Sequence, residues 1–178
     1  MLVSPPHVEN VMLAVLARPD YRRAMSEAAR LLREAGVDEP PIDPVSIARD
    51  NGVKVLFVEF DAAHDNISGF FDFEENTIFV NKNEFPLRQT FTVAHELGHK
   101  ILHSEWAKSS EYKILMRDQL FNGDDPHEKE ANVFAANLLV PRRMLDKYWK
   151  VASVEQLSRL FAVSVPMIKN RLSLEYGV

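Results

Sequence analysis

Apolar positions along the chain change from helical spacing to strand-like runs and then back to helical spacing. Two helical runs within residues 8–35 break near Pro19, and the second run, residues 21–34, ends before Gly36. A short helix is predicted over residues 44–51, where a glycine follows. The first part of the chain is therefore expected to be helical.

Three strands are predicted next. β-Branched and aromatic residues dominate residues 53–60, 67–73 and 76–81. Glu74 and Glu75 lie between the second and third runs and suit a hairpin turn. These runs predict a small three-stranded sheet.

Helical spacing returns after Pro86. One helix is predicted over residues 87–104 and another over 126–139, with the proline at its start in a first-turn position. The polar residues 108–125 between them are predicted to form a loop with a short helix, and two or three short helices fill residues 142–176. This order of elements predicts an α+β fold.

Composition limits the kinds of protein that this chain can be. With 178 residues, 46% hydrophobic and 26% charged, it can build one packed domain with a small appendage. The net charge of -5 argues against a dedicated nucleic-acid-binding protein. The absence of cysteine excludes disulfides, thiolate zinc ligands and a thiol nucleophile. The apolar run 11–17 is too short to span a bilayer and has the wrong flanks for export, so a cytoplasmic protein without a membrane partner is expected.

The segment His95-Glu96-Leu97-Gly98-His99 carries the strongest chemical signal. Histidines four residues apart share one face of a helix, so both imidazoles can bind one Zn²⁺. Glu96 can then take a proton from a water molecule at the metal. This H-E-x-x-H pattern lies in a predicted helix and indicates a hydrolytic metal site.

A catalytic zinc site usually has three protein ligands, so one ligand must come from elsewhere. His103, His127, Glu128 and Glu130 are candidates. His103 lies about 12 Å along the helix axis from His95, too far to share an ion unless the helix breaks.

The helix that begins at Pro126 offers a carboxylate ligand. Glu128 and Glu130 point about 160° apart on an ideal helix, so only one of them is expected to be the ligand, and Glu128 is preferred. Ala131 is small enough to let two helices approach closely. Asn132 can accept a hydrogen bond from the outer nitrogen of a ligand histidine.

The chain resembles the ImmA/IrrE-type metallopeptidases. The matching stretches are residues 41–48, 67–70, 78–81, 88–99 and 128–141. The specific part is the ordered pair of H-E-x-x-H and E-x-E-A-N-x-F-A-A, about thirty residues apart. The resemblance implies a thermolysin-type, zincin-like core with an active-site helix and a later helix that supplies a glutamate ligand.

Carried over residue by residue, the resemblance implies metal ligands His95, His99 and Glu128, with Glu96 as the general base. A related E-x-x-A-D pattern places the ligand on its first carboxylate, which favours Glu128 over Glu130. Asn132 stands at the last position of that pattern and keeps the acceptor without the charge. Zn²⁺ is the expected metal, with Mn²⁺ or Fe²⁺ as alternatives.

The resemblance also implies a function. It indicates a cytoplasmic zinc endopeptidase, a hydrolase that cleaves a helix-turn-helix transcriptional repressor and so derepresses genes of a mobile element, a prophage or a stress response. One alternative is the toxin of a toxin–antitoxin pair. Another is a non-proteolytic, zinc-stabilised module that binds a repressor or DNA.

Three parts of the chain follow from this interpretation: N-terminal helices over 1–37, the metallopeptidase core over 38–141, and a helical tail over 142–178 packed on the core. The tail has helix-turn-helix spacing with Lys169 and Arg171 in its second helix. Packing on the core is favoured over docking of a protein substrate and over DNA contact, because the tail has few cations.

Two further roles are open. A group besides the metal must stabilise the tetrahedral oxyanion, and the candidates are His103, Tyr112, Arg117 and His127. Residues 78–81 directly precede the motif helix, and we interpret them as an edge strand that aligns an extended peptide.

Overall fold

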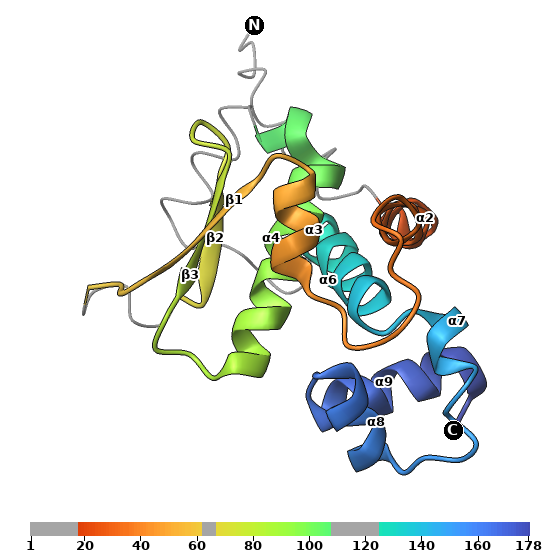
Figure 1. Ribbon diagram of the computed structural model, residues 1–178. Helices are drawn as coiled ribbons and strands as arrows, with labels where there is room; N and C mark the ends of the chain where they lie inside the picture. Colours follow the sequence, from red (N-terminus) through yellow and green to blue (C-terminus); the bar gives the residue numbers. More distant parts are fainter. Residues whose placement is uncertain (1–17, 62–66, 108–124) are drawn as a thin grey trace, which may run out of the picture.

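A small three-stranded sheet lies against a group of helices in the computed structural model, which describes residues 18–61, 67–107 and 125–178 (Figure 1). The helices are α2 (Tyr21–Glu34), α3 (Pro44–Asp50), α4 (Pro86–Ala107), α6 (Pro126–Leu139), α7 (Arg142–Leu145), α8 (Val154–Phe161) and α9 (Val165–Tyr176). The strands are β1 (Lys54–Val58), β2 (Gly69–Asp72) and β3 (Thr77–Asn81). The predicted α+β class with a small sheet is confirmed, while the helical run predicted before residue 18 and the polar segment 108–124 lie outside the described residues.

Helix starts follow from aspartates that cap the backbone. The side chains of Asp20, Asp43 and Asp125 accept backbone N–H groups two or three residues further on, at 2.9, 2.9 and 2.7 Å. Pro44 and Pro126 occupy the first turn of α3 and α6, where a missing N–H does no harm. Helices α2 and α6 span the residues that the sequence predicts.

The sheet has the strand order β1-β3-β2. Strand β1 pairs with β3 in parallel, and β2 pairs with β3 in an antiparallel hairpin whose turn includes Asn76 at φ 51°. The edge-strand interpretation of residues 78–81 is therefore wrong, because both sides of β3 are already paired. The order of the strands in the sequence does not show this, because β1 pairs with β3 and not with β2, the strand that follows it in the sequence.

Helices α4 and α6 pack against each other at very short range, and α4 also contacts β2 and β3 (Figure 1). A Cβ added to Gly98 would lie 3.0 Å from Cδ1 of Phe134 and 3.3 Å from Cα of Ala131. Gly98 suits this contact because even one added carbon would crowd the ring of Phe134 and the backbone of α6. The small residue predicted at Ala131 lies at this contact and is fully buried.

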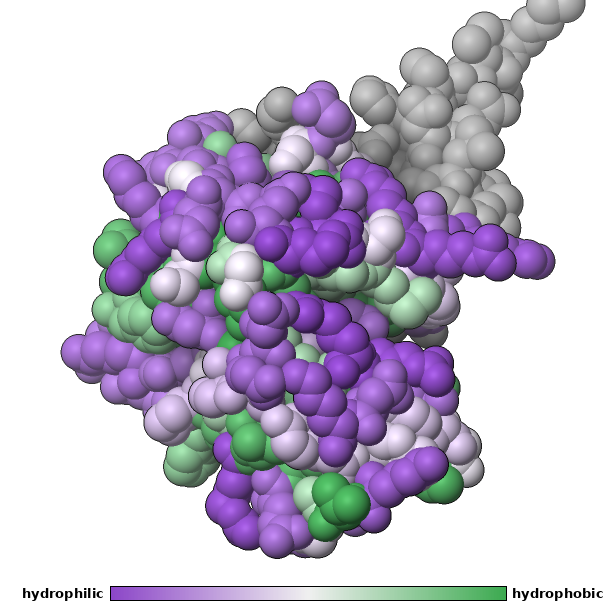
Figure 2. Space-filling model, turned by 45° about the vertical axis from the view of Figure 1, so that its right-hand side comes forward, coloured by the Kyte–Doolittle hydropathy of each residue, from purple (hydrophilic) through white to green (hydrophobic). Residues whose placement is uncertain are grey.

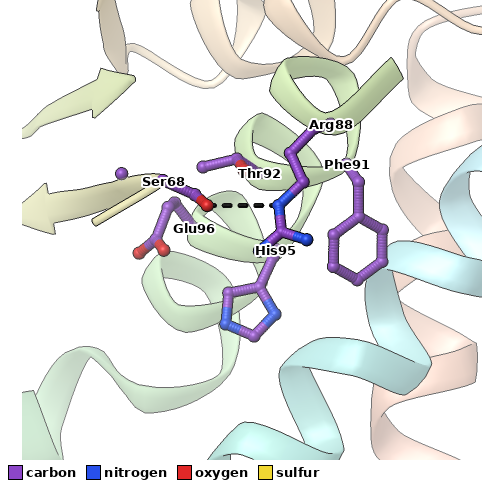
Figure 3. A pocket seen from close by; sticks show the side chains of 7 residues that line it. Ser68, Arg88, Phe91, Thr92, His95 and Glu96 are labelled. Atoms are coloured by element: carbon purple, nitrogen blue, oxygen red, sulfur yellow. Dashed lines mark hydrogen bonds between the residues drawn. The ribbon is translucent and has the colours of Figure 1, made fainter. Parts of the chain in front are cut away.

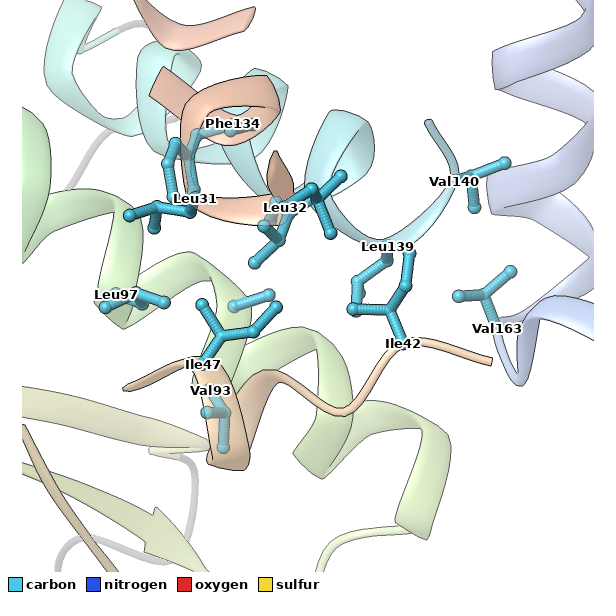
Figure 4. Close-up of a cluster of buried hydrophobic side chains, with 14 of the residues drawn as sticks. Leu31, Leu32, Ile42, Ile47, Val93, Leu97, Phe134, Leu139, Val140 and Val163 are labelled. Atoms are coloured by element: carbon cyan, nitrogen blue, oxygen red, sulfur yellow. The ribbon is translucent and has the colours of Figure 1, made fainter. Parts of the chain in front are cut away.

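Buried apolar side chains from α2, α3, α4 and α6 meet in one core beside the sheet. Figure 4 labels its central residues: Leu31, Leu32, Ile42, Ile47, Val93, Leu97, Phe134, Leu139, Val140 and Val163. Each of these side chains is at most 3% exposed. The cluster continues into α8 and α9, and the division of the chain at residues 37 and 141 stays a prediction.

The C-terminal helices α8 and α9 are joined by a turn in which Ala162 has φ 52°. Arg171 in α9 is only 3% exposed, donates from Nε to the carbonyl oxygen of Val140 at 3.1 Å, and pairs with Glu175 at 2.8 Å. This arginine therefore supports packing and is not exposed for contact with DNA.

The face in Figure 2 is mainly hydrophilic, with apolar side chains in small, separate patches. Among the described residues, no helix combines the length and the apolar character needed to cross a bilayer.

Gly98→Val is expected to lower the free energy of unfolding by more than about 2 kcal/mol, because the added methyl groups overlap Phe134 and Ala131. Urea titration followed by circular dichroism measures the change. Thr90→Val places the same residue at a half-buried position of α4 and should cost less than about 1 kcal/mol. Equal effects of the two substitutions would show that the helices do not meet so closely.

Candidate metal centre

Helix α4 places His95 and His99 on one face, with their Nε2 atoms 3.1 Å apart. The first turn of α6 brings Glu128 to both rings: Oε2 lies 3.2 Å from Nε2 of His95, and Oε1 lies 3.1 Å from Nε2 of His99. Asp125 fixes this turn by accepting the N–H groups of His127 and Glu128. Two helices that are distant in sequence thus direct three side chains of kinds that can bind a metal ion at one point.

Glu130 lies elsewhere. Its Oε2 is 2.9 Å from Nε2 of His103, and its Oε1 accepts the backbone N–H of Asp20 at 2.7 Å. Of the two carboxylates that the sequence offered, only Glu128 therefore reaches His95 and His99.

The geometry of the three groups fits a divalent cation. Tetrahedral N and O ligands about 2.0–2.2 Å from zinc lie about 3.3 Å from one another, close to the separations found here. One donor atom from each of His95, His99 and Glu128 lies within 4.8 Å of the other two, the only such group of three or more histidines and acidic residues in the described part of the chain. Nδ1 of His95 lies 3.0 Å from Oδ1 of Asn132, which can accept a hydrogen bond from an N–H at this position and so leave the lone pair of Nε2 for a metal ion.

Local charges favour the ionised carboxylate of Glu128. Burial by itself would raise the pKa of Glu128. The hydrogen bonds and the charges of His95 and His99 lower this pKa by more than burial raises it, so the net shift is downward. Burial lowers the pKa of His95, but Glu128 and Glu96 raise it, and the net shift is upward. The two shifts have one cause: the negative charge of Glu128 and the imidazoles beside it stabilise each other.

Glu96 is buried beside this cluster. Burial raises the pKa of Glu96, and the opposing effects of His95, His99 and the backbone N–H of Phe71 leave a net upward shift. A carboxylate with a raised pKa is a better proton acceptor than an ordinary one, which suits a general base.

A cavity of about 250 Å³ opens next to Glu96 and His95 (Figure 3). Its lining residues are Ser68, Gly69, Arg88, Phe91, Thr92, His95 and Glu96. Arg88 points into it and donates from Nε to Oγ of Ser68 at 3.2 Å. Sequence reasoning gave Arg88 no role, although it precedes His95 by seven residues, two helical turns, and therefore shares its face.

The wall opposite α4 comes from β2. A Cβ on Gly69 would lie 2.6 Å from both the carbonyl oxygen of Phe79 and Cγ2 of Thr92. Only glycine lets β2 lie so close to α4 at this side of the cavity.

The remaining histidine candidates are engaged elsewhere. Helix α4 bends at His103 (φ -122°, ψ 15°), yet this residue does not join the ligand cluster. Burial lowers the pKa of His103 to about 4, and both of its ring nitrogens have partners. His127 stacks on Trp106 and bonds Asp125 at 3.1 Å.

The occupied ring nitrogens of His103 argue against an oxyanion-binding role for it. Of the other three candidates for that role, His127 has its Nδ1 bonded to Asp125, while Tyr112 and Arg117 lie outside the described residues.

Known proteins with similar sequences are metallopeptidases and a phage immunity protein. The radiation response metalloprotease IrrE of Deinococcus radiodurans is 32% identical, over 56% of this chain and 35% of that protein. Metallopeptidase ImmA of Bacillus subtilis is 31% identical, over 47% of this chain and 48% of that protein. Uncharacterized immunity region protein 2 of Bacillus phage phi105 is 33% identical, over 48% and 52%. The chain thus spans about half, or less, of the length of these relatives.

A solved structure described as a Mycobacterium tuberculosis transcriptional regulator shares the fold, with a TM-score of 0.63 at 21% identity over 85% of this chain and 46% of that one. The family model described as the IrrE N-terminal-like domain matches residues 48–173, which include the sheet and both helices of the site. The chain therefore belongs to the peptidase family of the IrrE N-terminal-like domain, in which ImmA and IrrE are named relatives.

Proposed function

We propose that this protein is a zinc-dependent endopeptidase with a zincin-like core. His95, His99 and Glu128 are the proposed metal ligands, and Glu96 is the proposed general base. The observation that carries the proposal is the convergence of two imidazole nitrogens and one carboxylate at separations of 3.1–3.2 Å. The match to a peptidase family supports it.

In the proposed reaction, the metal and the side chains around it have separate roles. His95, His99 and Glu128 would hold the zinc ion, which when bound would lower the pKa of a water molecule and polarise the peptide carbonyl. Glu96 takes the proton of the attacking water and delivers it to the nitrogen of the leaving amine, so the carboxylate ends as it began. The raised pKa of Glu96 favours the first transfer.

The cavity beside Glu96 is the proposed place for the substrate. Arg88 directs N–H donors into it and can bind carbonyl or carboxylate oxygens of a peptide, while the ring of Phe91 offers an apolar surface. Strand β2 has one side unpaired within the described sheet, so it replaces β3 as the edge that can align an extended chain.

A helix-turn-helix transcriptional repressor in the cytoplasm is the proposed substrate, and its cleavage would release the genes it controls. Two names support this choice: the phage relative is an immunity region protein, and the structural neighbour is a transcriptional regulator. A toxin activity against another protein, or repressor binding without cleavage, are the alternatives that the experiments below separate.

Purified wild-type protein without a histidine tag should hold about one zinc ion per chain, whereas His99→Ala and Glu128→Ala should hold almost none. Inductively coupled plasma mass spectrometry measures the content. Glu75→Ala, on the hairpin turn away from the site, is the control for loss of a glutamate and should keep the metal. Full zinc content in Glu128→Ala would contradict the proposed ligand set.

Glu96→Gln should retain zinc and lose at least a hundredfold in cleavage rate, because the amide cannot accept the proton of the water. The probe is a library of proteome-derived peptides, with new termini quantified by mass spectrometry. Glu75→Gln, the matched control, should cleave like wild type. Cleavage by Glu96→Gln at the wild-type rate would exclude the proposed base, and a zinc-loaded wild type that cleaves nothing yet binds a repressor would favour the binding module.

A further inference from the structure

A buried chain of hydrogen bonds runs from His99 to the start of α2. Nδ1 of His99 lies 3.0 Å from Nδ1 of His103, and Nε2 of His103 lies 2.9 Å from Oε2 of Glu130. Oε1 of Glu130 accepts the backbone N–H of Asp20 at 2.7 Å. His103 is 4% exposed and Glu130 is 9% exposed, so water does not substitute for these partners easily.

The partners at the far end determine where each proton lies. A carboxylate accepts only, so Nε2 of His103 must carry the proton that faces Glu130. In a neutral ring the Nδ1 of His103 is then an acceptor. The contact between the two Nδ1 atoms allows one proton, and it must belong to His99. With its proton on Nδ1, His99 would have the lone pair of Nε2 available for a metal ion held between it, His95 and Glu128; without the ion, the carboxylate of Glu128, 3.1 Å away, competes for a proton on Nε2.

We propose that His103 and Glu130 are positioning residues that hold His99 in the tautomer and ring orientation required for metal binding. The inference rests on the metal centre proposed above and adds the residues that prepare it. His95 is oriented by a single partner, Asn132, whereas His99 is oriented through two side chains and a backbone N–H.

The fold explains how this chain of hydrogen bonds, from His99 through His103 and Glu130 to the backbone of Asp20 and called the relay below, can form. His103 follows His99 by four residues and so lies on the same face of α4, where the bend at His103 directs its ring toward α6. Glu130 belongs to α6, and its carboxylate lies at the N-terminus of α2, where it accepts the backbone N–H of the capping residue Asp20 near the positive end of the helix dipole. Helix α2 thereby contributes to the metal site without supplying a ligand.

The relay is tested by zinc affinity, measured by competition with a chromophoric chelator, and by the visible spectrum of the cobalt(II)-substituted protein. His103→Leu removes both hydrogen bonds, and Glu130→Gln leaves one acceptor for two donors. Both should weaken zinc binding by about 10- to 100-fold and alter the cobalt spectrum. His103→Gln keeps an acceptor and a donor and should bind within a few-fold of wild type.

His127→Gln is the matched control, because His127 contacts the ring of His103 but is not bonded to a ligand. It should bind zinc like wild type. Wild-type affinity in both His103→Leu and Glu130→Gln would overturn the relay, and so would a loss in His103→Gln as large as in His103→Leu.

A second measurement does not depend on the metal. Long-range ¹H–¹⁵N correlation spectra of metal-free Glu128→Ala protein, in which no carboxylate faces Nε2 of His99, report at mildly alkaline pH which nitrogen of His99 carries the proton. The relay predicts a proton on Nδ1. A proton on Nε2 in this variant would overturn the relay even if the wild type binds zinc, whereas a proton on Nδ1 together with a wild type that takes up no zinc would leave the relay in place and defeat the proposed peptidase function.

Discussion

The close approach of α4 and α6 is the constraint on which the site depends. Gly98 lies against Phe134 and Ala131, so the two helices are near enough for Glu128 to reach histidines on the other helix. Packed helices lie about 8–10 Å apart from axis to axis, and the side chains at the contact determine the distance. A larger side chain at position 98 would push α4 and α6 apart and move the carboxylate of Glu128 away from the imidazoles. The same glycine lies inside the H-E-x-x-H segment, so this segment makes the helix contact and also carries the two proposed histidine ligands.

The polar groups at this contact have partners. Nδ1 of His95 faces Asn132 at an exposed position, and Nδ1 of His99 faces His103 in the interior. Leaving the buried nitrogen of His99 unpaired would cost about 1–3 kcal/mol, so the contact with His103 stabilises the fold while it orients the ring. Structure and proposed chemistry therefore share the same hydrogen bonds.

Local signals in the sequence predicted much of the fold. Apolar spacing between Pro19 and Gly36 predicted the bounds of α2, Pro126 predicted the start of α6, and the spacing of the motif placed His95 and His99 on one face. The interpretation of β3 as an edge strand failed because strand order depends on long-range pairing, which alternation of residue types does not encode. The partner of Glu130 was missed for a similar reason: it lies across a helix contact, 27 residues away along the chain.

X-ray absorption spectroscopy at the zinc edge of the wild-type protein tests the central claim most directly. The account predicts two imidazole nitrogens and carboxylate or water oxygens at about 2.0–2.2 Å, and almost no zinc signal from His99→Ala purified in the same way. A wild-type spectrum that shows one imidazole or none, or a His99→Ala protein that gives the wild-type spectrum, would mean that zinc binds elsewhere and would contradict the account.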